Sequence, residues 1–118
     1  MMILRLAAAA ILLCICTLAS AEKHNEKWYQ TKFCEGVTEF VLEDKTRVDC
    51  LTKYHAIEFD WGHKWAECAG QAQYYARMTN TIAGCVLINP LPRFLKRLMI
   101  GFDGAIWIVN DKEIERIR

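Results

Sequence analysis

The stretch Arg47–Tyr75, RVDCLTKYHAIEFDWGHKWAECAGQAQYY, decides what the rest of this chain folds around. Its first half holds two short runs rich in Val, Ile, Leu, Phe and Thr, at Arg47–Thr52 and His55–Asp60. Only Lys53 and Tyr54 separate the two runs, and such a spacing predicts a β-hairpin. The second half, His63–Met78, has the periodicity of a helix. The stretch is therefore expected to fold as strand, tight turn, strand and helix.

The register of this hairpin decides which side chains meet. A loop of two residues, or of four placed symmetrically, puts Asp49 opposite Glu58 and Arg47 opposite Asp60. Side chains alternate between the faces of a strand, so the three acids then share one face. Directly opposed residues have Cβ atoms ~5 Å apart. Two carboxylates that close repel each other unless a cation, a proton or the facing arginine compensates. An odd loop would separate them.

The other face of the hairpin is expected to point into the core, because Val48, Cys50, Ile57 and Phe59 alternate with the acids. The helix that follows carries a polar stripe, whose members are Lys64, Glu67, Gln71, Tyr74, Tyr75 and Met78. Because this helix starts close to the acids, Lys64 and Gln71 are expected to reach back over them. The alternative for Lys64 is a solvated lysine paired with Glu67 or Asp60.

The remaining segments predict the other layers of the fold. The expected elements are a helix at Glu22–Gly36 with Gly36 as its C-cap, a strand at Val37–Leu42, a turn at Glu43–Thr46, a buried strand suited to parallel pairing at Ile82–Ile88, a short basic helix at Arg93–Ile100, a strand at Ala105–Val109, and a short helix or frayed end at Asp111–Arg118. This order predicts a single small α/β domain with one mixed sheet and helices on its faces.

Two glutamates outside the hairpin, Glu26 and Glu39, could also approach the acids. Glu26 on the first helix could point toward the acids, although a glutamate in a first helix is more often solvated. Glu39 lies on the first strand, and a turn of even length would put it on the face of Cys50, away from Asp49. Glu39 is therefore not counted among the candidate site residues.

The N-terminus has the layout of a secretory signal peptide. Met1–Arg5 carries one positive charge, Leu6–Leu18 is almost wholly apolar, and Ala19-Ser20-Ala21 is a small-x-small cleavage signal. The apolar run is shorter than the ~20 residues that a membrane-spanning helix needs. We therefore expect a signal peptide at residues 1–21, export, and a domain at residues 22–118 with no stable membrane span. The alternative is an uncleaved N-terminal anchor.

Four cysteines remain after residue 21, and they are Cys34, Cys50, Cys68 and Cys85. In an exported domain they predict two disulfides, for which three connectivities exist. The pair Cys34–Cys50 would tie the first helix to the hairpin and is the preferred one. Cys68 and Cys85 lie on a helix and the strand after it, so they are potential neighbours. The alternative is buried free thiols; zinc is disfavoured because no C-x-x-C spacing is present.

The charge balance limits what the protein can bind. The formal net charge is +1, and loss of Arg5 with the leader leaves the domain neutral. Proteins that bind nucleic acid strongly usually carry a net positive charge, and this domain does not. Nucleic acid would therefore have to use a local patch. Arg93, Lys96 and Arg97 are one candidate, although such a stripe is more often a solvated helix face.

Several segments of the chain closely resemble a group of small, mostly uncharacterised bacterial and phage proteins. That group resembles the PD-(D/E)XK nuclease superfamily, which has the fold of restriction endonucleases. The resemblance runs from His24 to Ile88 and implies a bacterial, periplasmic or secreted protein. The superfamily core has the order α-β-β-β-α-β, which agrees with the order predicted above. The segments that carry the resemblance are Arg47–Thr52, Ala56–Asp60, Lys64–Glu67, Gly70-Gln71 and Tyr74-Tyr75.

The resemblance assigns roles to individual residues. Asp49 matches the first acid of the superfamily and Glu58 the second. Gln71 and Tyr75 match the glutamine and tyrosine of the helix motif in RecB-like nucleases. Glu26 corresponds to the acid often found on the first helix.

Two departures from the superfamily pattern matter. Asp60 stands where a lysine is expected, and Lys64 is a candidate replacement one turn into the helix. Val48 stands in place of the proline before the first acid, which is a common change.

The resemblance also implies a chemistry. Asp49, Glu58 and Asp60 would hold Mg²⁺ or Mn²⁺ through hard oxygen ligands. Lys64 would orient the attacking water or neutralise the phosphate, while Gln71 and Tyr75 would position them. The expected function is an exported, metal-dependent nuclease-like protein that hydrolyses phosphodiester bonds. The alternative, favoured by the missing lysine and the neutral charge, is an inactive nuclease-fold module that binds or supports other molecules in the periplasm.

Overall fold

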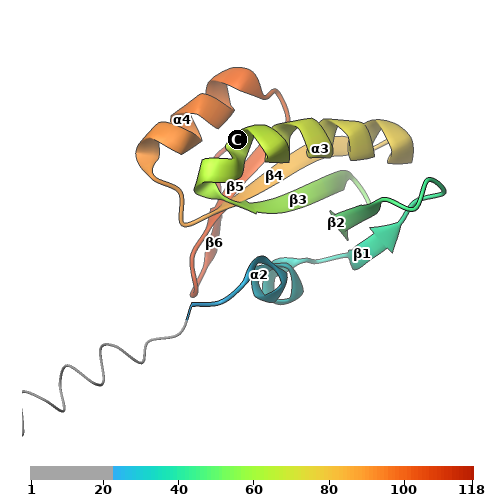
Figure 1. Ribbon diagram of the computed structural model, residues 1–118, viewed down its shortest axis with the longest axis horizontal. Helices are drawn as coiled ribbons and strands as arrows, with labels where there is room; N and C mark the ends of the chain where they lie inside the picture. The colour runs from blue at the N-terminus through green and yellow to red at the C-terminus, as the bar shows by residue number, and fades with distance from the viewer. Residues whose placement is uncertain (1–22) are drawn as a thin grey trace, which may run out of the picture.

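A computed structural model of the protein describes residues 23–118, where the chain forms a small α/β domain with a six-stranded mixed sheet and three α-helices (Figure 1). The predicted signal peptide lies outside the described residues. The helices are α2 (Glu26–Phe33), α3 (Trp65–Thr79), which follows a 3-10 turn at Gly62–Lys64, and α4 (Pro92–Gly101). The strands are β1 (Val37–Val41), β2 (Arg47–Leu51), β3 (His55–Trp61), β4 (Ile82–Ile88), β5 (Ala105–Val109) and β6 (Ile114–Arg116).

The six strands lie side by side in the order in which they occur in the chain. β1, β2 and β3 form an antiparallel meander, β3, β4 and β5 run parallel, and β6 returns antiparallel to β5. The apolar run at β4 is buried from Gly84 to Ile88 and pairs on both sides, as predicted. None of the helices within residues 23–118 combines the length and the apolar character needed to cross a membrane.

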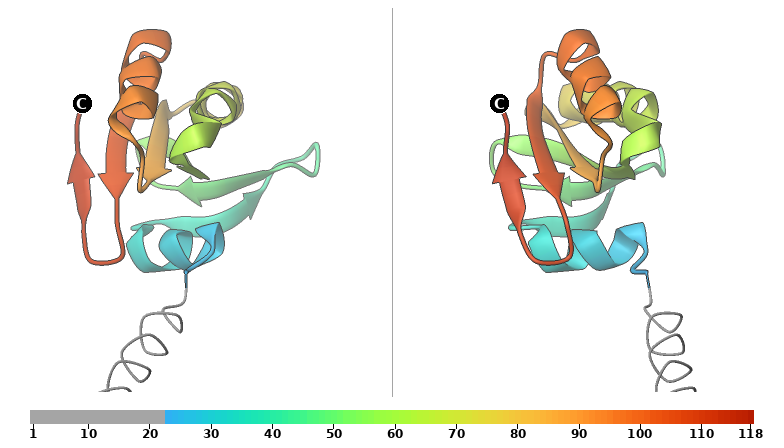
Figure 2. Two further views of the ribbon diagram at one scale, coloured as in Figure 1. Left: turned by 60° about the vertical axis from the view of Figure 1, so that its left-hand side comes forward. Right: turned by 90° about the vertical axis from the view of Figure 1, so that its left-hand side faces the viewer.

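Helices cover both faces of the sheet, so the domain has three layers (Figures 1 and 2). Helices α3 and α4 lie on one face, where Ala72, Leu87 and Phe102 belong to one buried cluster. Alanines at 69, 72 and 76 are buried in α3 and let the helix lie close to the sheet, as predicted. Helix α2 lies on the other face, where Tyr29 and Phe59 belong to a second cluster.

The first helix is shorter than predicted. It begins after Asn25, whose side chain accepts a hydrogen bond from the Trp28 N–H at 2.9 Å. It ends at Phe33, and its C-cap is Cys34 rather than Gly36. Gly36 has a different reason to be glycine. A Cβ there would lie 2.1 Å from the carbonyl oxygen of Leu51, so the residue allows β2 to approach closely.

The C-terminal segment was predicted to be a helix or a frayed end, and that prediction is wrong. The segment forms β6, in which Ile114 pairs with Val109 and Arg116 with Trp107. The Asn110 side chain accepts hydrogen bonds from the N–H groups of Lys112 and Glu113, which closes the turn between β5 and β6.

The four cysteines form two disulfides, Cys34–Cys50 and Cys68–Cys85, with Cα–Cα distances of 5.7 and 5.9 Å. Both the preferred pair and the expected neighbours are confirmed, and none of these four cysteines is a free thiol. The first disulfide joins the end of α2 to β2, and the second joins α3 to β4. The two helices on opposite faces of the sheet are thus each tied to it covalently.

Candidate functional site

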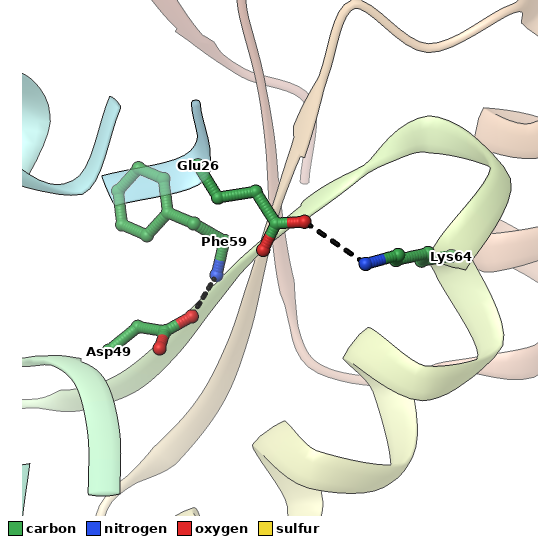
Figure 3. Close-up of polar contacts among 4 residues, drawn as sticks. All are labelled: Glu26, Asp49, Phe59 and Lys64. Atoms are coloured by element: carbon green, nitrogen blue, oxygen red, sulfur yellow. Dashed lines mark hydrogen bonds and ion pairs between the residues drawn. The ribbon is translucent and has the colours of Figure 1, made fainter. Parts of the chain in front are cut away.

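The register predicted for the central hairpin is confirmed, because Cys50 pairs with Ile57 and Leu51 with Ala56. Beyond Cys50 and Ile57 the backbone ladder stops, and carboxyl groups accept the hydrogen bonds between the two strands. The Asp49 N–H donates to Glu58 Oε1 at 3.1 Å. The Phe59 N–H donates to Asp49 Oδ2 at 2.9 Å (Figure 3). Each carboxyl group thus accepts from the backbone of the opposite strand. The site begins where β2 and β3 stop pairing through their own carbonyls.

An open polar cleft of about 500 Å³ collects all seven residues that the sequence proposed. They come from α2, β2, β3, the 3-10 turn and α3, and they are Glu26, Asp49, Glu58, Asp60, Lys64, Gln71 and Tyr75. Five further residues line the same cleft, namely Glu39, Lys45, Thr46, Arg47 and Glu67. The structure therefore brings the predicted set together and surrounds it with additional charge.

Two of the acids are buried, which is unusual for carboxyl groups. Glu58 is 4% exposed and Asp60 is 6% exposed. The Asp60 Oδ2 atom is buried and has no hydrogen-bond partner among the described residues. A buried polar atom without a partner carries a desolvation cost that a bound ligand can relieve.

Burial and mutual repulsion change the protonation of these acids. Burial, followed by the charge of the adjoining Asp49, raises the pKa of Glu58 to about 9. Burial also raises the pKa of Asp60 to about 7, assisted by Glu26 and Asp49 and partly opposed by Lys64. The pKa of Asp49 is raised by burial, against the hydrogen bond from Phe59. At neutral pH Glu58 therefore holds a proton.

Lys64 is held by Glu26 across the cleft. Its Nζ donates to Glu26 Oε1 at 3.2 Å, and the two side chains approach from α2 on one side and the 3-10 turn on the other (Figure 3). The bond to Glu26 raises the pKa of Lys64. The alternative pairing of Lys64 with Glu67 or Asp60 is therefore wrong. Glu26 is not a solvated helix residue but a partner of Lys64.

A turn of even length was predicted to put Glu39 on the face of Cys50, and that prediction is wrong. Val41 pairs with Arg47 and Phe40 with Val48, so the β1–β2 loop is odd and Glu39 lies level with Asp49. Glu39 also has φ +53°, a left-handed conformation that is rare for a non-glycine residue inside a strand. The length of the turn was the only signal in the sequence that could have placed it.

Arg47 was expected opposite Asp60. The two residues line the same cleft, but they form no backbone pair because the β2–β3 ladder stops at Cys50 and Ile57. Arg47 pairs with Val41 on β1, and its Nε lies 3.9 Å from Glu39 Oε2. Val48 departs from its expected partners too, because it clusters with Ala56 and the residues of α3 rather than with Cys50. Both departures have one cause, which is that β2 is no longer paired with β3 at these positions.

The donor chemistry of the cleft suits a hard divalent cation, since carboxylate oxygens are the ligands that Mg²⁺ and Mn²⁺ prefer. The buried Asp60 Oδ2 is one such oxygen without a partner. Within residues 23–118, no group of three or more His, Cys, Asp and Glu side chains is already arranged as a metal-ligand set. A cation would therefore have to displace protons and draw Asp49, Glu58 and Asp60 together.

Comparisons of the chain with protein-family models, with curated proteins and with solved structures gave no match.

Proposed function

We propose that the protein is an exported, metal-dependent nuclease-like enzyme that hydrolyses phosphodiester bonds on a restriction-endonuclease-like core. The order of elements from α2 to β4 supports the proposal, because it reads α-β-β-β-α-β as in that superfamily. So does the position of Asp49 and Glu58 on neighbouring strands, with Gln71 and Tyr75 on the helix that follows.

The observation that carries the proposal is the buried Asp60 Oδ2, which has no partner and lies in a cleft with two other acids. A divalent cation held by Asp49, Glu58 and Asp60 would give that oxygen a partner and replace the proton on Glu58. Such an ion, when bound, activates a water molecule and stabilises the negative charge that develops at phosphorus.

The remaining side chains of the cleft would handle the substrate. Lys64 has three N–H donors, and Glu26 accepts one of them, so the ammonium group can also contact a phosphate. Gln71 and Tyr75 line the same cleft from α3 and would orient the phosphate or the attacking water. Glu26 acts as a positioning residue for Lys64.

Export is supported by the two disulfides, which persist in oxidising compartments and are rare in the cytosol. It is also supported by the composition of residues 1–21. The compartment that fits both features is the bacterial periplasm or the medium.

A second function is favoured by the ion pair of Lys64 with Glu26. Asp60 occupies the place of the superfamily lysine, and an ammonium group even ~1 Å from its productive position loses much of its effect. The cleft would then belong to a catalytically inactive nuclease-fold module that binds or supports another molecule.

An activity assay separates the two functions. The oxidised protein is incubated with single- and double-stranded DNA and RNA in Mg²⁺, Mn²⁺ or EDTA. Cleavage that is lost both in EDTA and in Glu58→Gln, but kept in the exposed control Glu115→Gln, supports the enzyme. Metal binding by calorimetry without cleavage supports the inactive module. Absence of both cleavage and metal binding overturns the proposed metal site.

A further inference from the structure

A second cavity, of about 410 Å³, lies where β3 and β4 end. β3 leads there into the 3-10 turn and α3, and β4 leads into α4 (Figure 1). The carboxyl ends of parallel strands are where α/β sheets most often bind ligands. The cavity is lined by Lys23, Trp61, Gly62, His63, Ile88, Asn89, Leu91 and Phe94.

The lining combines flat aromatic surfaces with basic groups. Trp61 and Phe94 supply two rings, Lys23 and His63 supply basic nitrogen atoms, and no acid is among the lining residues. Two guanidinium groups flank the Phe94 ring, with Arg93 at 4.7 Å and Arg97 at 5.7 Å from its centroid. The rim is thus basic in a domain whose overall charge is close to neutral.

The walls of this cavity are held in place. A Cβ on Gly62 would lie 2.6 Å from the Cα of Pro90, so the turn after β3 packs directly on the loop after β4. The Trp61 ring meets Tyr29 edge-on at 5.9 Å. Asn89 has φ +45°, and such non-glycine residues cluster at ligand sites.

The cavity adjoins the acidic cleft along the backbone. Asp60 lines the cleft and the next residue, Trp61, lines the cavity. In the same way Lys64 lines the cleft and the preceding residue, His63, lines the cavity. The cleft and the cavity are therefore lined by directly adjacent residues at two points of the chain, Asp60–Trp61 and His63–Lys64.

We propose that this cavity binds one nucleotide of a single-stranded nucleic acid whose next phosphate lies in the acidic cleft. The base stacks on Trp61 or Phe94, and the phosphate is contacted by Lys23, His63 or Arg93. Aromatic rings beside basic side chains are the usual means of holding single strands. A duplex would first have to unpair and unstack a base before that base could enter the cavity, so we expect a single strand to bind more tightly. The role of the bound strand as a substrate rests on the function proposed above.

Binding is measured by fluorescence anisotropy of a labelled oligothymidine in EDTA, at low and moderate salt. We expect Phe94→Ala to weaken binding about tenfold, which is the usual loss for one stacked base. Arg93→Ala is expected to weaken binding severalfold and to reduce its dependence on salt. The matched controls are Phe40→Ala on the exposed edge strand and Arg77→Ala on α3. Thermal unfolding of each variant checks that it is folded. Arg93 is exposed, so Arg93→Ala is expected to fold and tests the cavity even if Phe94→Ala does not.

Equal binding of a duplex with the same sequence would overturn the inference, as would losses in the controls that match those in the cavity variants. Binding is measured in EDTA and therefore does not depend on metal. If the strand binds in EDTA but is not cleaved in a separate assay with Mn²⁺, the result supports the cavity and counts only against the nuclease. Cleavage that is insensitive to Phe94→Ala and Arg93→Ala supports the nuclease and counts against the cavity.

Discussion

Strand β3 pairs with its two neighbours very differently. Along β4 it is paired from His55 to Trp61 without interruption, whereas along β2 the ladder holds only Cys50 with Ile57 and Leu51 with Ala56. The continuous edge builds the core, and the interrupted edge builds the acidic cleft. The same strand thus stabilises the domain through its pairing with β4. On the side of β2 it lacks most backbone pairs, and its carboxyl groups lie there instead.

The largest expected effect tests the continuous side. Leu87 on β4 is fully buried, so Leu87→Ala should lower the free energy of unfolding by about 2–5 kcal/mol. Ile82 lies on the same strand and is 55% exposed, and Ile82→Ala should change it by less than about 1 kcal/mol. Urea unfolding with the disulfides intact measures both. Similar losses in the two variants would mean that β4 is not the centre of the core.

A smaller effect is expected on the interrupted side, where stability should depend on pH. The pKa of Glu58 rises from an ordinary 4.5 to about 9, so above pH 4.5 the folded chain holds a proton that the unfolded chain releases. The stability that this proton supports is present at low pH and is lost as the pH rises toward 9. In EDTA the melting temperature should therefore fall between pH 5 and pH 9.

Variants of Glu58 test the source of this slope. Glu58→Gln keeps the shape without the titrating group, so its melting temperature should vary less over the same range. Glu115→Gln, on an exposed strand, should keep the slope of the parent. An equally steep fall in Glu58→Gln would show that the acid cluster is not the origin of the pH dependence.

The smallest effect concerns the ion pair between Glu26 and Lys64. Both side chains are partly exposed, so a double-mutant cycle of Glu26→Gln with Lys64→Met should give a coupling energy of only ~0.5 kcal/mol. Measuring Mn²⁺ affinity in the same variants separates the positioning of Lys64 by Glu26 from the contribution of the pair to stability. Glu26→Gln alone frees the ammonium group of Lys64. The resulting change in the free energy of Mn²⁺ binding to the cleft should exceed the change in the free energy of unfolding. A coupling energy above ~2 kcal/mol would place the pair among the structural contacts instead.

Much of the interrupted edge was predictable because local rules decide it. The two-residue spacing of Lys53 and Tyr54 set the register of the hairpin, and that register put Asp49 beside Glu58. The disulfide Cys34–Cys50 was the preferred one of three connectivities because it ties the first helix to the hairpin, and the structure contains it. Helix α3 and strands β4 and β5 have long or strongly apolar patterns, which tertiary contacts did not alter.

The features that escaped prediction depend on contacts between distant segments. Gly36 was assigned to a helix end, but its small size serves the approach of Leu51. Strand β6 is three residues long and exists because β5 offers it an edge. Glu39 was misplaced because one residue more in the β1–β2 loop inverts every face of β1. Lys64 met Glu26 rather than Glu67, since helix spacing says nothing of what lies on α2.

The left-handed backbone at Glu39 also affects how this molecule meets its copies. β1 is an edge strand whose outer side includes exposed Val37, Phe40 and Val41, a composition that favours strand-to-strand association. At its middle residue the strand departs from extended geometry and carries a charge. An incoming strand would therefore find no continuous ladder to extend. One residue thus supplies negative charge to the cleft and limits aggregation at the border of the sheet.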